Sequence, residues 1–237
     1  MPNLTLTPKP ITIAAGESTS VSGLLLVPPK ATACYVLAHG AGAGMTHSFL
    51  VNVAAELYAR NIATLRYQFP YMEAKSKRPD PPKLAQATVR AAVKEAARLL
   101  PELPLLAGGK SFEGRMTSQA QAAEPLPGVR ALIFLGFPLH AAGKPSRERG
   151  AHLSEIRIPM LFLQGTRDAL ADLTELEPLV ASLAKRATLK LFSDADHSFH
   201  VPVRTGRKDA DVLAEMMDVF AAFVSKTLTR QPQIACE

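Results

Sequence analysis

The sequence has little cysteine, no long apolar segment and no dense basic surface, and each absence excludes a class of protein. Its two cysteines are far apart, with Cys34 in an apolar run and Cys236 next to the C-terminus, so we expect no disulfide and a reducing compartment. No apolar run approaches the roughly 20 residues of a membrane-spanning helix. The stretch MPNLTLTPKP lacks the basic segment and apolar core of a signal peptide. We therefore expect a cytoplasmic protein without a membrane partner.

Positive charge exceeds negative charge, but the basic residues are scattered along the chain. The formal net charge is +6, and the densest basic group is Lys75-Ser76-Lys77-Arg78. No aromatic platform or basic helix face accompanies this group, so a solvated loop is favoured over a nucleic-acid site. We expect no nucleic-acid partner, while a preference for anionic substrates stays open.

Apolar residues make up 47% of the 237 residues, which supports a sizeable core and excludes a disordered chain. Apolar and polar side chains alternate near the N-terminus, from Leu4 and Leu6 onward, with an interruption at Ala15-Gly16-Glu17. This alternation predicts two antiparallel strands. Beyond Pro28-Pro29, apolar runs alternate with helical stretches, which is typical of buried parallel strands joined by crossover helices.

The expected elements together describe one α/β domain over residues 1–237. Strands are predicted at 34–38, 62–67, 103–107, 131–136, 159–164 and 188–192. The clearest helices are predicted at 83–100 and 208–227, where apolar residues recur at helical spacing. We predict a mostly parallel sheet of about eight strands, covered on both faces by helices. An N-terminal antiparallel hairpin precedes it, and no large cap domain is expected.

The stretch GGKSFEGR at 108–115 follows a predicted strand and opens a helical pattern. A strand, a sharp turn and a helix form the context of a hydrolase nucleophile elbow, with Ser111 as the nucleophile. Gly109 permits a steep turn, and the helix N-terminus stabilises negative charge nearby. The alternative is that Ser111 only caps the helix, and this stretch alone does not separate the two interpretations.

Two further strand ends carry the other groups that acyl transfer uses. Asp168 follows the strand at 159–164, where a carboxylate can orient a histidine, although aspartate is also common in plain turns. His197 follows the last predicted strand and is placed to act as a general base. A metal site made of His197, His200 and the neighbouring aspartates is the competing interpretation. The H-x-x-H spacing supports it poorly, and we expect no metal.

The order Ser111, Asp168, His197, at the ends of three separate strands, is the chain order of α/β-hydrolases. The loop that begins at His39 is rich in small residues, so its backbone N–H groups are free to donate to an oxyanion. Ala41 is the favoured donor and Gly42 the next, while the N–H of Phe112 is the expected second donor.

The same loop permits a rival interpretation as a phosphate-binding turn of a dinucleotide-binding protein. Its glycines Gly40, Gly42 and Gly44 have the spacing G-x-G-x-G, whereas the dinucleotide fingerprint is G-x-G-x-x-G. The end of the next strand offers no acidic ligand for a ribose, although Arg66 suits a 2′-phosphate. We therefore expect no dinucleotide cofactor.

With these segments in place, the chain resembles the α/β-hydrolase superfamily over nearly its whole length. Within it, the chain is most similar to the small, capless, dienelactone-hydrolase-like serine hydrolases. The resemblance is carried by HGAGAGM at 39–45, RYQFPYME at 66–73, GGKSFEGRM at 108–116, GFPLH at 136–140, QGTRDAL at 164–170 and DADHSF at 194–199. It implies Ser111 as nucleophile, His197 as base and Asp168 as the orienting acid. Dienelactone hydrolases proper use a cysteine nucleophile, so their substrate is not carried over.

One departure from the family pattern concerns Glu113. Members of that family typically show G-K-S-x-G-G-R here, so a glutamate replaces a glycine. We expect its side chain to point outward from the first helical turn, where the helix dipole favours its charge by ~0.3–1 kcal/mol. A carboxylate directed into the pocket would raise the pKa of His197 or exclude anionic acyl groups, so its direction bears on catalytic strength.

Other loop residues near strand ends are candidates for lining a substrate pocket. They are His39, Gly42, His47, Phe69, Tyr71, Phe137 and His140, together with Glu113. For His47 and His140, a surface or structural role is an equal alternative. Lys110 and Arg115 flank Ser111 and either form structural ion pairs or attract an acidic substrate.

The sequence thus predicts a serine hydrolase that cleaves a small ester or thioester through an acyl-enzyme, with no metal or organic cofactor. Its expected partner is a small-molecule ester, and we expect a monomer or a homodimer. One alternative is a catalytically weak or inactive hydrolase-fold protein that serves as a binding or scaffold module. The less favoured alternative is a dinucleotide-binding protein.

Overall fold

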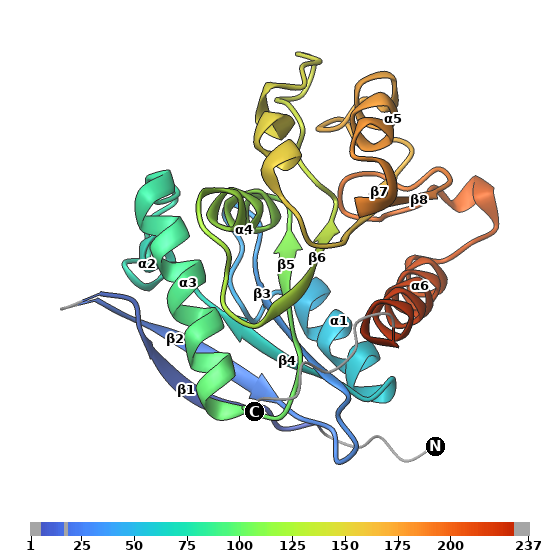
Figure 1. The fold of residues 1–237 in the computed structure, drawn as a ribbon. Helices are drawn as coiled ribbons and strands as arrows, with labels where there is room; N and C mark the ends of the chain where they lie inside the picture. The colour runs from blue at the N-terminus through green and yellow to red at the C-terminus, as the bar shows by residue number, and fades with distance from the viewer. Residues whose placement is uncertain (1–5, 17–18, 230–237) are drawn as a thin grey trace.

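The computed structural model describes residues 6–16 and 19–229, and its central feature is an eight-stranded sheet (Figure 1). The strand order is β1-β2-β4-β3-β5-β6-β7-β8. β2 is antiparallel to β1 and β4, whereas all other neighbouring strands are parallel. The strands are β1 (Lys9–Ala14), β2 (Ser20–Leu26), β3 (Ala33–Ala38), β4 (Ile62–Tyr67), β5 (Leu105–Lys110), β6 (Val129–Leu135), β7 (Met160–Gly165) and β8 (Ala187–Phe192). The predicted N-terminal hairpin and mostly parallel sheet are confirmed.

Helices cover both faces of this sheet, and the sheet separates two hydrophobic cores (Figure 1). The helices are α1 (Ser48–Ala59), α2 (Pro70–Glu73), α3 (Pro82–Leu99), α4 (Phe112–Ala123), α5 (Leu173–Ser182) and α6 (Asp209–Thr229), with short 3₁₀ helices η1 (Glu148–Glu155), η2 (Ala184–Arg186) and η3 (Val203–Thr205). α1 and α6 pack together on one face, and α3, α4 and α5 cover the other. Both faces of the central strands are therefore buried.

The central strand β3 shows why the apolar runs do not alternate. All of its residues, Ala33–Ala38, are buried, because helices lie over both faces of the sheet at this point. β4 is buried along its whole length in the same way. A continuous apolar run is the sequence pattern of such a strand, whereas the partly exposed β1 and β2 keep the alternating pattern.

The strand predicted at 103–107 begins later and extends further than expected, as β5 from Leu105 to Lys110. Gly108 and Gly109 were expected to form the turn, but they lie inside the strand, both with φ of +146°. A Cβ on Gly108 would lie 1.9 Å from the Ile133 carbonyl oxygen, and one on Gly109 would lie 1.8 Å from Glu113 Oε2. The two glycines therefore serve close packing around β5, and the turn falls at Ser111.

Short helices and loops join the strands, and no part of the described chain forms a cap domain over the carboxyl edge of the sheet. Within residues 6–16 and 19–229, no helix combines the length and apolar character needed to cross a membrane. β1 starts at Lys9, so Leu6 lies outside the strand that the alternation predicted. Leu4, Glu17 and Cys236 lie outside the described residues.

Candidate active site

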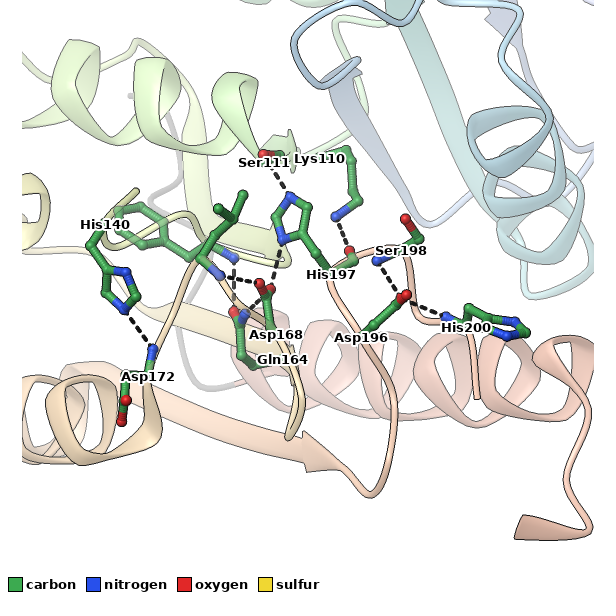
Figure 2. Close-up of polar contacts among 12 residues, drawn as sticks. Lys110, Ser111, His140, Gln164, Asp168, Asp172, Asp196, His197, Ser198 and His200 are labelled. Atoms are coloured by element: carbon green, nitrogen blue, oxygen red, sulfur yellow. Dashed lines mark hydrogen bonds and ion pairs between the residues drawn. The ribbon is translucent and has the colours of Figure 1, made fainter. Parts of the chain in front are cut away.

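Ser111 lies at the turn between β5 and α4, with φ of 54° and ψ of −113°. A positive φ is rare for a residue with a side chain and costs on the order of 1–3 kcal/mol, so the surrounding structure must hold it. Ser111 makes no side-chain capping bond to α4 in the described structure. The interpretation of Ser111 as a simple helix cap is therefore wrong, and its hydroxyl faces His197 instead (Figure 2).

Ser111, His197 and Asp168 form a continuous chain of hydrogen bonds (Figure 2). His197 Nε2 lies 2.8 Å from Ser111 Oγ, and His197 Nδ1 lies 2.6 Å from Asp168 Oδ2. An ionised carboxylate only accepts hydrogen bonds, so Asp168 selects the tautomer with hydrogen on Nδ1. Nε2 is then left to accept the Ser111 hydroxyl proton. The structure thus brings these three residues together from the carboxyl ends of β5, β7 and β8.

The Asp168 carboxylate is fully buried and is held by groups other than His197. Leu170 N–H donates to Oδ1 at 2.8 Å, and the Gln164 side-chain amide donates to Oδ2. Gln164 Oε1 in turn accepts from Phe137 N–H at 2.8 Å, which fixes the orientation of the amide. Gln164 was not predicted as a site residue. Its one sequence signal is a polar side chain inside the apolar run of β7.

The arrangement of the histidine loop separates His197 from His200 (Figure 2). His200 Nδ1 lies 2.9 Å from Asp209 Oδ2, and this carboxylate raises the pKa of the exposed His200 ring. Asp196 accepts from the backbone N–H groups of Ser198 and His200. Among the described residues, no group of three or more His, Cys, Asp or Glu side chains has an arrangement that would hold a metal ion.

A cavity of about 740 Å³ opens beside Ser111 and His197 and extends over α1 to the start of α6. Its apolar walls include Phe49 and Leu50 of α1, Phe199, and Leu213 of α6. Of the predicted pocket residues, His39 and His47 border it. His47 also caps α1, because its Nδ1 accepts from Phe49 N–H at 3.3 Å. His39 is buried and donates to the Gly40 carbonyl oxygen, 2.9 Å away, while Phe69 N–H lies 3.4 Å from its Nε2.

The loop after β3 lies against Ser111. A Cβ on Gly40 would lie 3.4 Å from Ser111 Cβ, and Ala41 borders the same cavity. Gly42 N–H donates to the Tyr71 hydroxyl at 3.3 Å, whereas the N–H groups of Ala41 and Phe112 have no hydrogen-bond acceptor within the described structure. Between the two predicted loop donors, this difference favours Ala41 over Gly42.

The cavity is not bordered by six of the predicted pocket residues: Gly42, Phe69, Tyr71, Glu113, Phe137 and His140. Phe69 and Phe137 are fully buried in aromatic clusters, because the Phe69 ring packs against Tyr67 and the Phe137 ring against Phe134. Tyr71 borders a separate hollow beside the charged loop that follows α2. His140 accepts from Asp172 N–H at 2.7 Å and donates to the Ala141 carbonyl oxygen at 2.8 Å, so it has the structural role that was its alternative (Figure 2).

The prediction that Glu113 points outward is wrong, because its side chain is fully buried beneath the elbow. Tyr67 and Thr117 hydroxyls donate to its Oε1 at 3.0 and 2.6 Å, and Oε2 has no partner among the described residues. Burial raises the pKa of this carboxyl to about 8, against the smaller lowering by Thr117 and Tyr67. Glu113 is therefore a protonated core residue at neutral pH and does not border the cavity.

The basic residues that flank Ser111 make no ion pair within the described part of the chain. The Arg115 guanidinium lies 5.9 Å from the centre of the Phe112 ring. Lys110 donates to the backbone carbonyl of His197 (Figure 2). The ion-pair interpretation of both residues is therefore wrong.

A second serine–histidine contact lies further along α4. Ser118 Oγ is 2.8 Å from His152 Nε2 and donates to the Arg115 carbonyl oxygen at 2.9 Å. Ser118 is buried in the helix packing, and burial together with the charge of Arg115 lowers the pKa of His152 to about 4. No carboxylate contacts His152 among the described residues. This pair does not border the cavity beside Ser111.

Comparison with known proteins agrees with this architecture. Residues 31–225 match the model of the alpha/beta hydrolase domain family. A lidless α/β serine hydrolase from Xanthomonas campestris is 21% identical, with 95% of this chain and 97% of that chain covered at a TM-score of 0.71. A dienelactone hydrolase from Anabaena variabilis is 18% identical, with 93% and 98% covered at a TM-score of 0.73. The family match covers most of the chain, and the two structures share its fold, so this chain belongs to the alpha/beta hydrolase domain family.

Proposed function

We propose that the protein is a serine hydrolase that cleaves a small ester or thioester through an acyl-enzyme intermediate. The observation that carries this proposal is the hydrogen-bonded chain from Ser111 through His197 to Asp168, which opens into a cavity. A nucleophile, a base and an orienting acid in mutual contact are the groups that acyl transfer requires.

In the proposed reaction, Ser111 Oγ attacks the carbonyl carbon while His197 Nε2 takes the hydroxyl proton. His197 then gives this proton to the leaving alcohol or thiol, and a water molecule activated by His197 releases the acyl group. Asp168 stabilises the imidazolium that forms between these steps, because its buried carboxylate lies 2.6 Å from Nδ1. The route uses no metal or organic cofactor.

The developing oxyanion would be held by the N–H groups of Ala41 and Phe112. Among residues 6–16 and 19–229 neither N–H has another acceptor, and both belong to segments that contact Ser111. The Phe112 N–H lies at the N-terminus of α4, whose dipole further favours negative charge at this point. Donors of this kind typically contribute about 3–4 kcal/mol each to stabilising the transition state.

The cavity supports a small or medium-sized acyl or leaving group. Its volume is about 740 Å³, and Phe49, Leu50 and Leu213 give it an apolar wall close to Ser111. The described chain places no cap over it, so small substrates reach the nucleophile without the opening of a lid. We expect p-nitrophenyl esters of short chain length to be better substrates than long lipid esters.

Labelling with a fluorophosphonate probe tests this proposal, because such probes react with an activated serine. The wild-type protein is expected to label, and Ser111→Ala is expected to abolish labelling. Ser118→Ala is the matched control: it removes the other histidine-bound serine, and we expect it to label like the wild type. Absence of labelling in the folded wild-type protein would instead favour a binding or scaffold role.

A further inference from the structure

The side chain of Lys110 connects the nucleophile turn to the loop of the base. Lys110 is the last residue of β5, directly before Ser111, and its Nζ donates to the backbone carbonyl oxygen of His197 (Figure 2). The segment that carries Ser111 and the loop that carries His197 are thus connected twice, by the Ser111–His197 hydrogen bond and by this Lys110 contact. The backbone of His197 is therefore tied to the same strand that carries Ser111.

The fold leaves space for this contact at one glycine. Gly136 follows β6 with φ of +74°, and a Cβ there would lie 2.8 Å from Lys110 Nζ and 3.5 Å from the His197 ring. A Cβ at this position would overlap the ammonium group, while it would lie at ordinary van der Waals distance from the imidazole. The absence of a side chain at position 136 thus permits Lys110 and His197 to meet.

Two stacked phenyl rings hold the ammonium group from the cavity side. Lys110 Nζ lies 5.9 Å from the centre of the Phe49 ring and 5.4 Å from that of Phe199. The two rings are 5.9 Å apart and nearly parallel, with an interplanar angle of 5°. Cations are attracted to aromatic faces at such distances. The rings therefore favour a charged amine at this place, where the described residues offer it no paired carboxylate.

The surroundings of Lys110 shift the pKa of its amine in two opposite directions. Burial lowers the pKa of its amine to about 8, while the charges of Asp168 and Asp196 act in the opposite direction. His197 is the titratable side chain next to it, and His47 and His200 border the same cavity. At neutral pH most molecules thus carry the charged donor, and this fraction falls as the solution becomes alkaline.

We propose that Lys110 is a positioning residue whose ammonium group, through the His197 carbonyl, holds the imidazole in line between Asp168 and Ser111. The inference rests on the proposed function, because it concerns the rate at which His197 activates Ser111. Lys110 touches no reacting atom. Without this contact, Ser111, Asp168 and His197 are all still present, but the His197 loop is free to move away from productive geometry.

The test compares Lys110→Met, which keeps the length of the side chain but removes its charge and donors, with Lys190→Met. Lys190 is a matched control, because its Nζ also lies 5.9 Å from a phenyl ring, that of Phe192, but is paired with Glu215. We expect Lys110→Met to lower the fluorophosphonate labelling rate and kcat by about 10- to 100-fold, with little change in KM. Lys190→Met is expected to behave like the wild type.

Two further readouts separate positioning from a general loss of structure. Ethylammonium added to Lys110→Ala is expected to restore part of kcat, because it supplies the missing cation beside the two rings and the His197 carbonyl. The wild-type pH profile is expected to decline on its alkaline side near the Lys110 pKa of about 8, and Lys110→Met is expected to lack this decline. The wild-type decline needs no variant, so it tests the inference even where a variant fails to fold.

The outcomes distinguish this inference from the proposed function. If the wild-type protein does not label, the proposed function fails and the inference fails with it. If the wild type labels and Lys110→Met labels equally fast, only the inference is overturned. A rise in KM for anionic esters with unchanged kcat also overturns it, because Lys110 would then bind substrate.

Discussion

Lys110 and Glu113 are ionisable residues on either side of Ser111, yet their side chains lie in different surroundings. Lys110 faces the cavity, where two phenyl rings and the His197 carbonyl surround its ammonium group. Glu113 faces the core, where the hydroxyls of Tyr67 and Thr117 donate to it and the Ala38 backbone also lowers its pKa. Burial opposes the charge of both, lowering one pKa and raising the other. In the described part of the chain, opposite charges lie near Lys110, from Asp168 and Asp196, whereas no positive charge contributes to the pKa of Glu113.

The electrostatic environment therefore differs between the cavity side and the core side of the turn at Ser111. On the cavity side, the charged groups of Lys110 and Asp168 contact His197, next to Ser111. On the core side, a carboxyl group is kept neutral and serves as a hydrogen-bond acceptor under the turn. A neutral Glu113 adds no negative charge to the neighbourhood of His197, so the substitution of glycine by glutamate is compatible with the proposed chemistry.

The largest expected effect is on the cavity side, at Asp168. We expect Asp168→Asn to lower kcat about 10⁴-fold, because an amide no longer selects the tautomer with hydrogen on Nδ1. Asp194→Asn is the control, since Asp194 follows the same strand as His197 but lies half exposed, 3.7 Å from Arg204. Ester hydrolysis measured for both variants checks this. A loss of less than ten-fold in Asp168→Asn would contradict the proposed role.

The next effect concerns stability on the core side. The folded-state pKa of Glu113, about 8, lies above the usual 4.5, so between these values the unfolded chain loses a proton that the folded protein keeps. The contribution of this group to stability is therefore largest below about pH 4.5, falls as pH rises and levels off above about pH 8. The slope due to this group is about 1.4 kcal/mol per pH unit.

Glu113→Gln removes this titration and retains an acceptor for Tyr67 and Thr117. We expect its stability relative to the wild type to increase from pH 5 to pH 8 by a few kcal/mol, in the range set by the raised pKa. Urea denaturation at several pH values measures this difference. Parallel pH dependence of the two proteins would show that Glu113 is ionised in the folded state.

A smaller effect, on both the stability of the fold and the labelling rate, is expected at Gly136 on the cavity side. We expect Gly136→Ala to destabilise the fold by about 1–2 kcal/mol and to slow labelling, because its Cβ would overlap Lys110 Nζ and displace it from the His197 carbonyl. Gly143→Ala is the matched control, since Gly143 has a similar φ of +70° but no atom within 4 Å of the Cβ position. Both variants share the backbone strain, and only Gly136→Ala is expected to slow labelling. Equal labelling rates would argue against the Lys110 contact.

Much of the fold was predictable because local patterns report it. The buried runs of β3 and β4 and the alternation of β1 and β2 directly reflect whether one or both sheet faces are covered. The end of β5 was not predictable in this way. Gly108 and Gly109 look like a turn in sequence, but the packing of Ile133 and Glu113 against β5 makes them part of the strand.

The sequence by itself determined which residues stand at the strand ends, including Ser111, Asp168 and His197. The apolar runs locate the strands to within a few residues, and the ends of parallel strands share one edge of the sheet, so these three residues are expected at that edge even though the end of β5 was not predicted correctly. Only the tertiary structure decided the contacts of Gln164 with Asp168 and of Lys110 with His197. It also turned Glu113 inward. The direction of a side chain depends on the space and partners that distant segments supply, and no local pattern records them.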